Sequence, residues 1–130
     1  MKTEVIKIDQ NNMDTEALER AAAIIRDGGL VAFPTETVYG LGADALSAEA
    51  SKKIYAAKGR PSDNPLIVHV AEFSDMEKIA QEMPEEAKKL ADAFWPGPLT
   101  MILPRRENVP LQTTGGLETV GVRCPDHPVT

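Results

Sequence analysis

The 130-residue sequence has few of the features that mark secreted or membrane proteins: it contains one cysteine, few aromatic residues and no long apolar run. A lone cysteine cannot form an internal disulfide, and a membrane-spanning helix needs about 20 consecutive apolar residues. We therefore expect neither a disulfide framework nor a membrane segment, and a reducing cytoplasm as the location.

Positive charge is also scarce, because 14 Lys and Arg stand against 20 Asp and Glu, for a net charge of -6. Proteins that bind the phosphate backbone usually carry a basic surplus, so direct RNA binding is not favoured. The hydrophobic content of 42% is typical of globular proteins, and the length suits one domain. We expect residues 1–130 to form a single domain.

Helical spacing of apolar residues predicts two helices in the first half of the chain. The first covers 15–27 behind an Asp14 cap, and the second starts at a Ser47 cap and ends before Gly59. Two more helices are expected in the second half, one with Ser74 and Glu77 as a capping box. The other follows Pro84, and its apolar stripe comprises Ala87, Leu90, Ala91 and Phe94.

Strands are expected between these helices, at 1–10, 30–33, 66–70, 99–103 and 119–123, with a polar loop over 104–116. Strands that alternate with helices favour an α/β fold, a twisted open mixed sheet with flanking helices. The last expected strand ends seven residues before Thr130, and no helix follows it to cover the sheet. We expect the domain to be incomplete at its C-terminal end.

The loop over 34–42 holds more threonine and glycine than a plain connection needs. Thr35 and Thr37 could simply bond local backbone groups in a turn, or they could line a ligand site, since loops after sheet strands often do. Gly40 and Gly42 begin a G-x-G-x-x-A pattern, but six residues separate Gly40 from the expected strand. That spacing argues against a dinucleotide-binding turn.

A second candidate site lies between the helix that ends near Gly59 and the strand at 66–70. Lys58 and Arg60, two residues apart and close to Asn64, form a compact cationic receptor for polyphosphate. The alternative is structural, because Lys58 could complement a helix dipole and Asn64 could hold a turn. No P-loop signature is present, so side chains would hold any phosphate.

The third candidate site is formed by His69 and Arg123, each at the end of an expected strand. A planar guanidinium suits bidentate contact with a carboxylate, whereas the structural alternatives are a packed neutral histidine and a surface arginine. Cys124 lacks a nearby base and is expected to be a buried structural thiol. Two histidines and one cysteine give no zinc spacing, so no metal ligands are predicted.

Four ordered motifs of this sequence resemble those of the threonylcarbamoyl-AMP synthase family, the YrdC-like domain. They are FPTETVYGLG at 33–42, KGRPSDNPLIVHV at 58–70, WPGPLT at 95–100 and VGVRCPDHP at 120–128. The resemblance implies condensation of L-threonine, bicarbonate and ATP into L-threonylcarbamoyladenylate and pyrophosphate. That product would serve tRNA threonylcarbamoyladenosine modification, through the downstream tRNA threonylcarbamoyl-transferase machinery.

The resemblance also implies roles for individual residues. Thr37, His69 and Arg123 match positions that hold L-threonine. Positions that hold ATP correspond to Arg60, Asn64 and Thr119, and Lys58 with Arg60 would act on the reacting nucleotide and bicarbonate. Mg2+ would be held mainly by the ATP phosphates.

The family's downstream Ser-x-Asn motif has no counterpart in this sequence, so 1–130 is expected to be the N-terminal two-thirds of a YrdC-like domain. Two other functions remain open. One is an RNA-binding module that uses a local basic patch of Lys52, Lys53, Lys58 and Arg60. The other is a carbamoyl-adenylate enzyme with a different acceptor.

Overall fold

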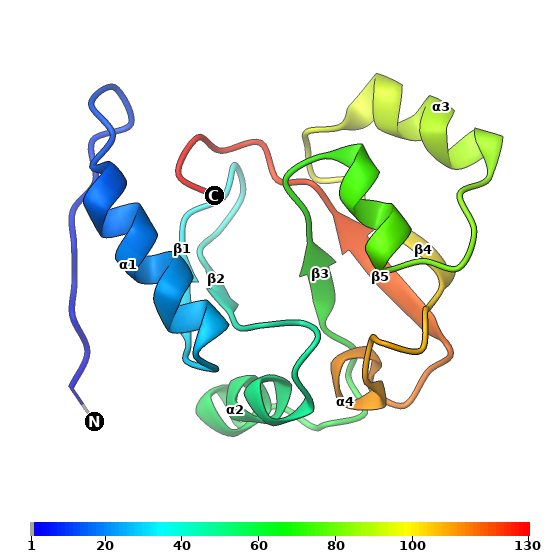
Figure 1. Cartoon of the computed structure of the whole chain (residues 1–130), viewed down its shortest axis with the longest axis horizontal. Helices are drawn as coiled ribbons and strands as arrows, with labels where there is room; N and C mark the ends of the chain where they lie inside the picture. The colour runs from blue at the N-terminus through cyan, green and yellow to red at the C-terminus, as the bar shows by residue number, and fades with distance from the viewer. Residues whose placement is uncertain (1) are drawn as a thin grey trace.

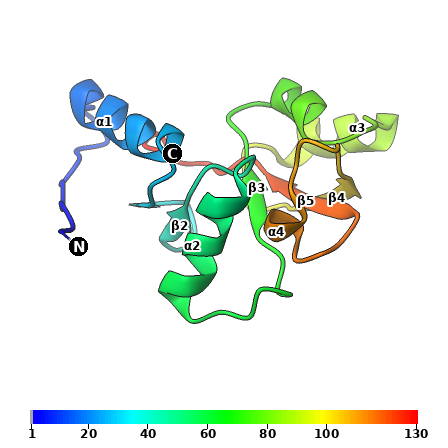
Figure 2. The same cartoon turned by 60° about the horizontal axis from the view of Figure 1, so that its bottom comes forward.

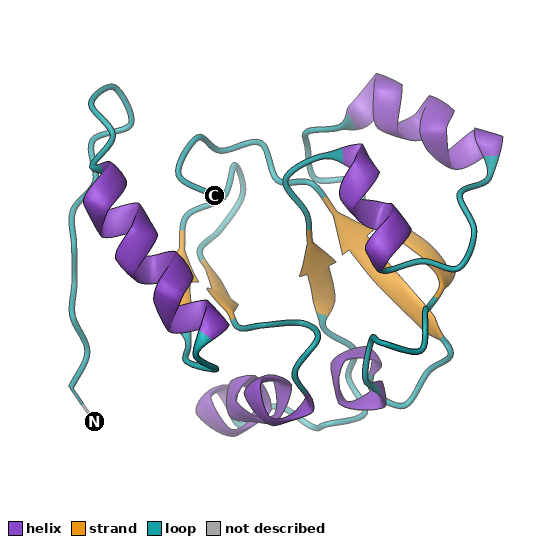
Figure 3. Cartoon of the chain, viewed as in Figure 1, coloured by secondary structure: helices purple, strands orange, loops and turns teal. Residues whose placement is uncertain are grey.

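The computed structural model describes residues 2–130, in which helices are interspersed with strands along the chain (Figures 1 and 3). They are α1 (Thr15–Arg26), β1 (Val31–Phe33), β2 (Gly40–Gly42), α2 (Ala48–Lys58), β3 (Ile67–His69), the 3-10 helix η1 (Phe73–Lys78), α3 (Glu85–Phe94), β4 (Met101–Pro104), α4 (Leu111–Thr114) and β5 (Thr119–Arg123). The predicted α/β architecture is confirmed.

The strands form two sheets. β1 and β2 make an antiparallel pair, while β5 lies between β3, to which it is parallel, and β4, to which it is antiparallel. In the parallel pair His69 stands opposite Arg123. A mixed sheet was predicted, but its separation into a two-stranded and a three-stranded sheet was not.

One face of the three-stranded sheet carries the core. In Figure 2, η1 and α3 lie above this sheet. Their buried residues pack against the strand residues of the face that the two helices cover. Alternate residues of a strand point to opposite faces. The buried cluster comprises Val68, Met76, Ile79, Ala87, Ala91, Met101, Val109, Val120 and Val122.

The opposite face of the same sheet is much less covered, and we call it the open face. Ile67 and Ile102, which belong to it, are 50% and 70% exposed. By the same alternation its other members are His69, Thr119, Gly121 and Arg123. Three of the predicted site residues, His69, Thr119 and Arg123, therefore share the open face of the sheet.

The ends of the first two helices follow from their sequence. The Asp14 side chain accepts from the Ala17 amide, and Ser47 accepts from the Ala50 amide, as predicted for caps. Gly59 ends α2 with a positive φ of 61°, a conformation that costs glycine little. This turn delivers the segment after Lys58 toward β3.

The predicted N-terminal strand is wrong for the described residues. Residues 2–8 form no strand, and Met1 lies outside the described part of the chain. Val5 is 90% exposed, so the alternation of this segment has no sheet to pair with.

Two details of the C-terminal helices also differ from expectation. The capping box of η1 uses Glu72 and Asp75 rather than Ser74 and Glu77. In α3 only the two alanines of the predicted stripe are buried, because they pack on the core, whereas Leu90 and Phe94 are 42% and 58% exposed.

The predicted polar loop over 104–116 is partly ordered and buried. It contains α4, and Val109 and Thr113 are among its buried residues. The Ser51 and Thr113 hydroxyls bond at 2.8 Å, and Thr113 also donates to the Ala45 carbonyl. Buried polar groups need such partners, and here they come from α2 and the segment before it.

Candidate substrate-binding site

Thr37 and Arg123 meet at the end of β5, where the strand leads into the C-terminal segment. Arg123 Nη2 donates to Thr37 Oγ1 at 3.4 Å, and Arg123 Nε donates to the Gly97 carbonyl at 3.4 Å. The Arg123 side chain is 13% exposed and also forms an ion pair with Glu36. The guanidinium is thus held in place by two separate segments, the loop with Glu36 and Thr37 and the loop with Gly97.

Thr35 organises the turn that carries Thr37. Its hydroxyl donates to the Val38 carbonyl at 2.6 Å and accepts from the Thr37 amide at 3.2 Å. The two threonine hydroxyls also lie 3.1 Å apart. The local turn and the contact with Arg123 coexist, because Thr35 makes the first and Thr37 the second.

His69 lies opposite Arg123 in the register of β3 and β5. Its ring packs edge-on against Phe33, with the ring centroids 5.5 Å apart. Burial lowers the pKa of His69 below its usual value, so the imidazole is neutral at neutral pH. A neutral imidazole can both donate and accept a hydrogen bond.

The two glycines of β2 make room for this packing. A Cβ on Gly40 would lie 2.9 Å from the Phe33 ring, and one on Gly42 only 2.5 Å from it. The G-x-G pattern therefore serves a strand that accommodates an aromatic ring, and it does not form a nucleotide-binding turn.

Arg60 and Thr119 lie at the opposite end of the open face. Arg60 Nη2 donates to the Pro65 carbonyl at 2.7 Å. Pro65 precedes Ile67 by two residues and Thr119 precedes Gly121 by two, and the parallel register pairs Ile67 with Gly121. Thr119 and Arg123 are four positions apart on β5, which corresponds to about 13 Å along an extended strand.

Lys58 and Asn64 flank the Arg60 end and are both exposed. Within the described residues neither side chain has a hydrogen bond or ion pair. Lys58 is the last residue of α2, where a cation complements the helix dipole. The backbone N–H of Asn64 donates to the Pro61 carbonyl in a turn. The helix-end lysine and the asparagine turn that the sequence suggested are thus both present, and both side chains remain free for a ligand.

Two buried polar atoms without partners lie near this segment, Tyr55 Oη and Arg60 Nε. Burial raises the pKa of Tyr55, while the positive charge of Arg60 lowers it by a smaller amount. The Arg60 end of the open face thus has unused hydrogen-bonding capacity, in contrast to the Arg123 end.

The basic patch considered for RNA binding is largely engaged within the protein. Lys52 pairs with Glu49 at 3.0 Å, and Lys53 donates to the Gly28 carbonyl at 2.6 Å. Arg60 bonds Pro65. These contacts leave Lys58 as the free cation of that patch within residues 2–130.

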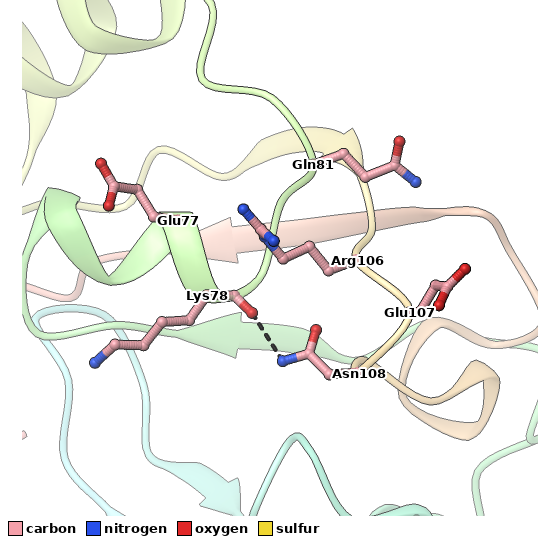
Figure 4. Close-up of a pocket in the computed structure, with 6 residues that line it drawn as sticks. All are labelled: Glu77, Lys78, Gln81, Arg106, Glu107 and Asn108. Carbon is pink, nitrogen blue, oxygen red and sulfur yellow. Dashed lines mark hydrogen bonds between the residues drawn. The ribbon is translucent and has the colours of Figure 1, made fainter.

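Other parts of the described chain carry less chemistry. Figure 4 shows an open hollow beside η1, where Arg106 and Asn108 tie their segment to the backbone carbonyls of Ala80 and Lys78. Cys124 is buried, as predicted, and burial raises its thiol pKa.

Residues 2–130 have neither a cluster of metal ligands nor a membrane-spanning helix. They contain no group of three or more His, Cys, Asp or Glu side chains placed to hold a metal ion. No helix in the same range is long and apolar enough to cross a membrane.

Glu36 is the residue of this site that sequence reasoning missed. It stands between the two threonines of the turn, and a glutamate in a loop is usually a solvated charge. Its partner, Arg123, is distant in the sequence, so the pattern gave no signal for the ion pair.

Known proteins resemble this chain in sequence and structure. A family model described as telomere recombination, Sua5/YciO/YrdC, matches residues 23–130. The threonylcarbamoyl-AMP synthases of Pyrococcus abyssi and Bacillus subtilis are 62% and 53% identical to it over 84% and 93% of the chain. These matches cover 32% and 35% of the two relatives, so the chain spans about a third of their length.

A solved structure of P. abyssi Sua5 in complex with L-threonine superposes with a TM-score of 0.88 at 58% identity. The match covers 91% of this chain and 35% of that one. On the strength of the family model and these relatives, the chain belongs to the Sua5/YciO/YrdC family, that of the threonylcarbamoyl-AMP synthases.

Proposed function

We propose that this chain is an L-threonylcarbamoyladenylate synthase, which condenses L-threonine, bicarbonate and ATP into threonylcarbamoyl-AMP and pyrophosphate. The observation that carries the proposal is the contact of Thr37 with Arg123, with His69 opposite Arg123 in the sheet register. The relatives named threonylcarbamoyl-AMP synthase, and the L-threonine complex of one Sua5, support it.

At the Arg123 end, the three side chains match the groups of L-threonine. The guanidinium of Arg123 binds the α-carboxylate, because its planar fork forms paired charge-assisted hydrogen bonds. Thr37 and neutral His69 bond the substrate hydroxyl or amine, since each can donate and accept. The α-amine is thereby directed along the open face.

At the other end, Arg60, Asn64 and Thr119 bind ATP, and Lys58 with Arg60 neutralises the phosphates. The separation of about 13 Å between Thr119 and Arg123 suits a substrate pair that meets over Gly121. A Cβ on Gly121 would lie 3.2 Å from Thr100 Cγ2, so Thr100 is a neighbour of this meeting point. These residues supply cations rather than carboxylates, so Mg2+ is held mainly by the ATP phosphates.

The chemistry requires positioning rather than a protein nucleophile. The threonine amine combines with bicarbonate to give an N-carboxylate and water. An oxygen of this carboxylate then attacks the α-phosphorus of ATP, and pyrophosphate leaves with the electrons of the broken P–O bond. Held cations stabilise the charge that develops on the phosphates.

The product would pass to the tRNA threonylcarbamoyl-transferase machinery, and direct RNA contact is not required of this chain. The experiment that tests the proposal measures pyrophosphate release from ATP and Mg2+, with and without L-threonine and bicarbonate. Release that depends on both supports the proposal, and Arg123→Ala should abolish it. Release that ignores threonine but responds to another amine would point to a different acceptor, and no release at all would contradict the proposal.

A further inference from the structure

Glu36 is the acidic partner of Arg123 in the structure. One carboxylate oxygen of Glu36 pairs with Arg123 Nη2, and the other accepts from the Asp126 amide. The side chains of Arg123 and Glu36 are 13% and 21% exposed, so water screens this pair poorly.

The position of Glu36 matters because of what it contacts. Arg123 Nε is directed to the Gly97 carbonyl, which leaves the Nη side of the guanidinium for a carboxylate. Glu36 occupies Nη2, and Thr37 Oγ1 accepts from the same nitrogen. A side-chain carboxylate and an α-carboxylate are chemically equivalent for this fork, so both cannot hold it fully at once.

We propose that Glu36 is a built-in competitor for the carboxylate subsite, which an incoming amino acid must displace from Arg123. The inference rests on the proposed function, since it takes L-threonine as the ligand. Displacement frees Glu36 from both Arg123 and the Asp126 amide, while the Thr35 hydroxyl keeps the turn itself closed.

Such a competitor makes the site selective. A ligand that has only a carboxylate contacts only Arg123, and to do so it must displace the chemically equivalent carboxylate of Glu36. Its net gain in binding free energy is therefore small. L-Threonine brings a hydroxyl and an amine in addition, and these reach Thr37 and His69 without competition from Glu36. The apparent affinity of a ligand falls in proportion to the fraction of molecules in which its site is free, so a site free in about one molecule in ten binds about tenfold more weakly.

The test compares Glu36→Gln and Glu36→Ala with the unmodified chain by calorimetric titration of L-threonine. Glu107→Gln is the matched control, because it removes the same charge from an exposed side chain that has no partner among the described residues. We expect both Glu36 variants to bind L-threonine about five- to tenfold more tightly. Glu107→Gln should leave its affinity unchanged.

L-Threoninol, which lacks the carboxylate, separates competition from other effects. Its affinity should not rise in the Glu36 variants, because it does not use Arg123. Unchanged or weaker binding of L-threonine by both variants would overturn the inference, as would equal tightening for L-threoninol. If the unmodified chain does not bind L-threonine at all, the proposed function fails first, which distinguishes the two failures.

Discussion

The two ends of the open face differ in how many contacts hold their side chains in place. At the Arg123 end, Thr37 and the Gly97 carbonyl bond a guanidinium that is 13% exposed, and Glu36 competes for the same group. At the Thr119 end, Lys58 and Asn64 are exposed and unbonded within the described residues. A small amino acid with fixed groups benefits from rigid partners, whereas a nucleotide with several phosphates can recruit mobile cations on binding.

Arg123→Ala should have the largest effect, because it removes the central group of the organised end. Charge-assisted hydrogen bonds contribute about 1.5–3 kcal/mol each. The loss of one such bond should raise the Kd for L-threonine about tenfold to a hundredfold. L-Valine and L-serine should weaken alike, since the carboxylate is common to all three. Calorimetry provides the measurement, and a loss confined to threonine would contradict the role of Arg123.

Lys58→Ala and Arg60→Ala should act on ATP instead, each removing about 1.5–3 kcal/mol of binding if it makes one charged hydrogen bond. Their effects on stability should differ. Arg60→Ala should lower the free energy of unfolding by about 0.5–1.5 kcal/mol, because Arg60 bonds the Pro65 carbonyl.

Lys58→Ala should stay within about 0.5 kcal/mol of the unmodified chain in the same denaturant titrations. Unchanged ATP affinity in both variants would contradict the assignment of this segment.

Gly42→Ala should disturb the organised end through packing. Its Cβ would lie 2.5 Å from the Phe33 ring, and overpacking of this kind costs about 1–3 kcal/mol. Because the ring also packs on His69, the affinity for L-threonine should fall, while ATP affinity should not. In a Phe33→Ala background the stability cost of Gly42→Ala should disappear, and a cost that persists would exclude the ring as its cause.

A smaller effect is expected from pH. Burial lowers the pKa of His69 in the folded state, so the unfolded chain binds more protons below about pH 6.5. Stability contributed by neutral His69 is present above that value and is lost as the pH falls through the lower folded pKa. Denaturant titrations between pH 7.5 and 5.5 should show a shallower decline for His69→Gln than for His127→Gln, and equal declines would contradict this.

Local signals in the sequence predicted the elements that depend on local chemistry. Ser47 and Gly59 bound α2 as expected, and β5 spans the predicted 119–123. β2 was not predicted, because two glycines are poor strand formers and only the Phe33 ring of the neighbouring strand explains them. The buried Thr113 was likewise hidden, since its partner Ser51 lies on another helix.

The candidate site follows the same division. Arg123, His69 and Thr37 could be grouped through motif resemblance, and the structure brings them to one end of one face. Glu36 could not be found, because an ion pair between distant segments leaves no local pattern. The hydrogen bond from Arg60 to the Pro65 carbonyl was not predicted for a different reason: a cation next to a turn was interpreted only as a phosphate ligand.

The most direct test of the organised Arg123 end is a titration of L-threonine and L-valine into the unmodified chain without ATP. The account predicts that L-threonine binds and that L-valine binds at least about fivefold more weakly, because a polar group left unpaired costs about 1–3 kcal/mol. Thr37→Ala should narrow that gap. Equal affinity for the two amino acids, or no binding of L-threonine without ATP, would contradict it.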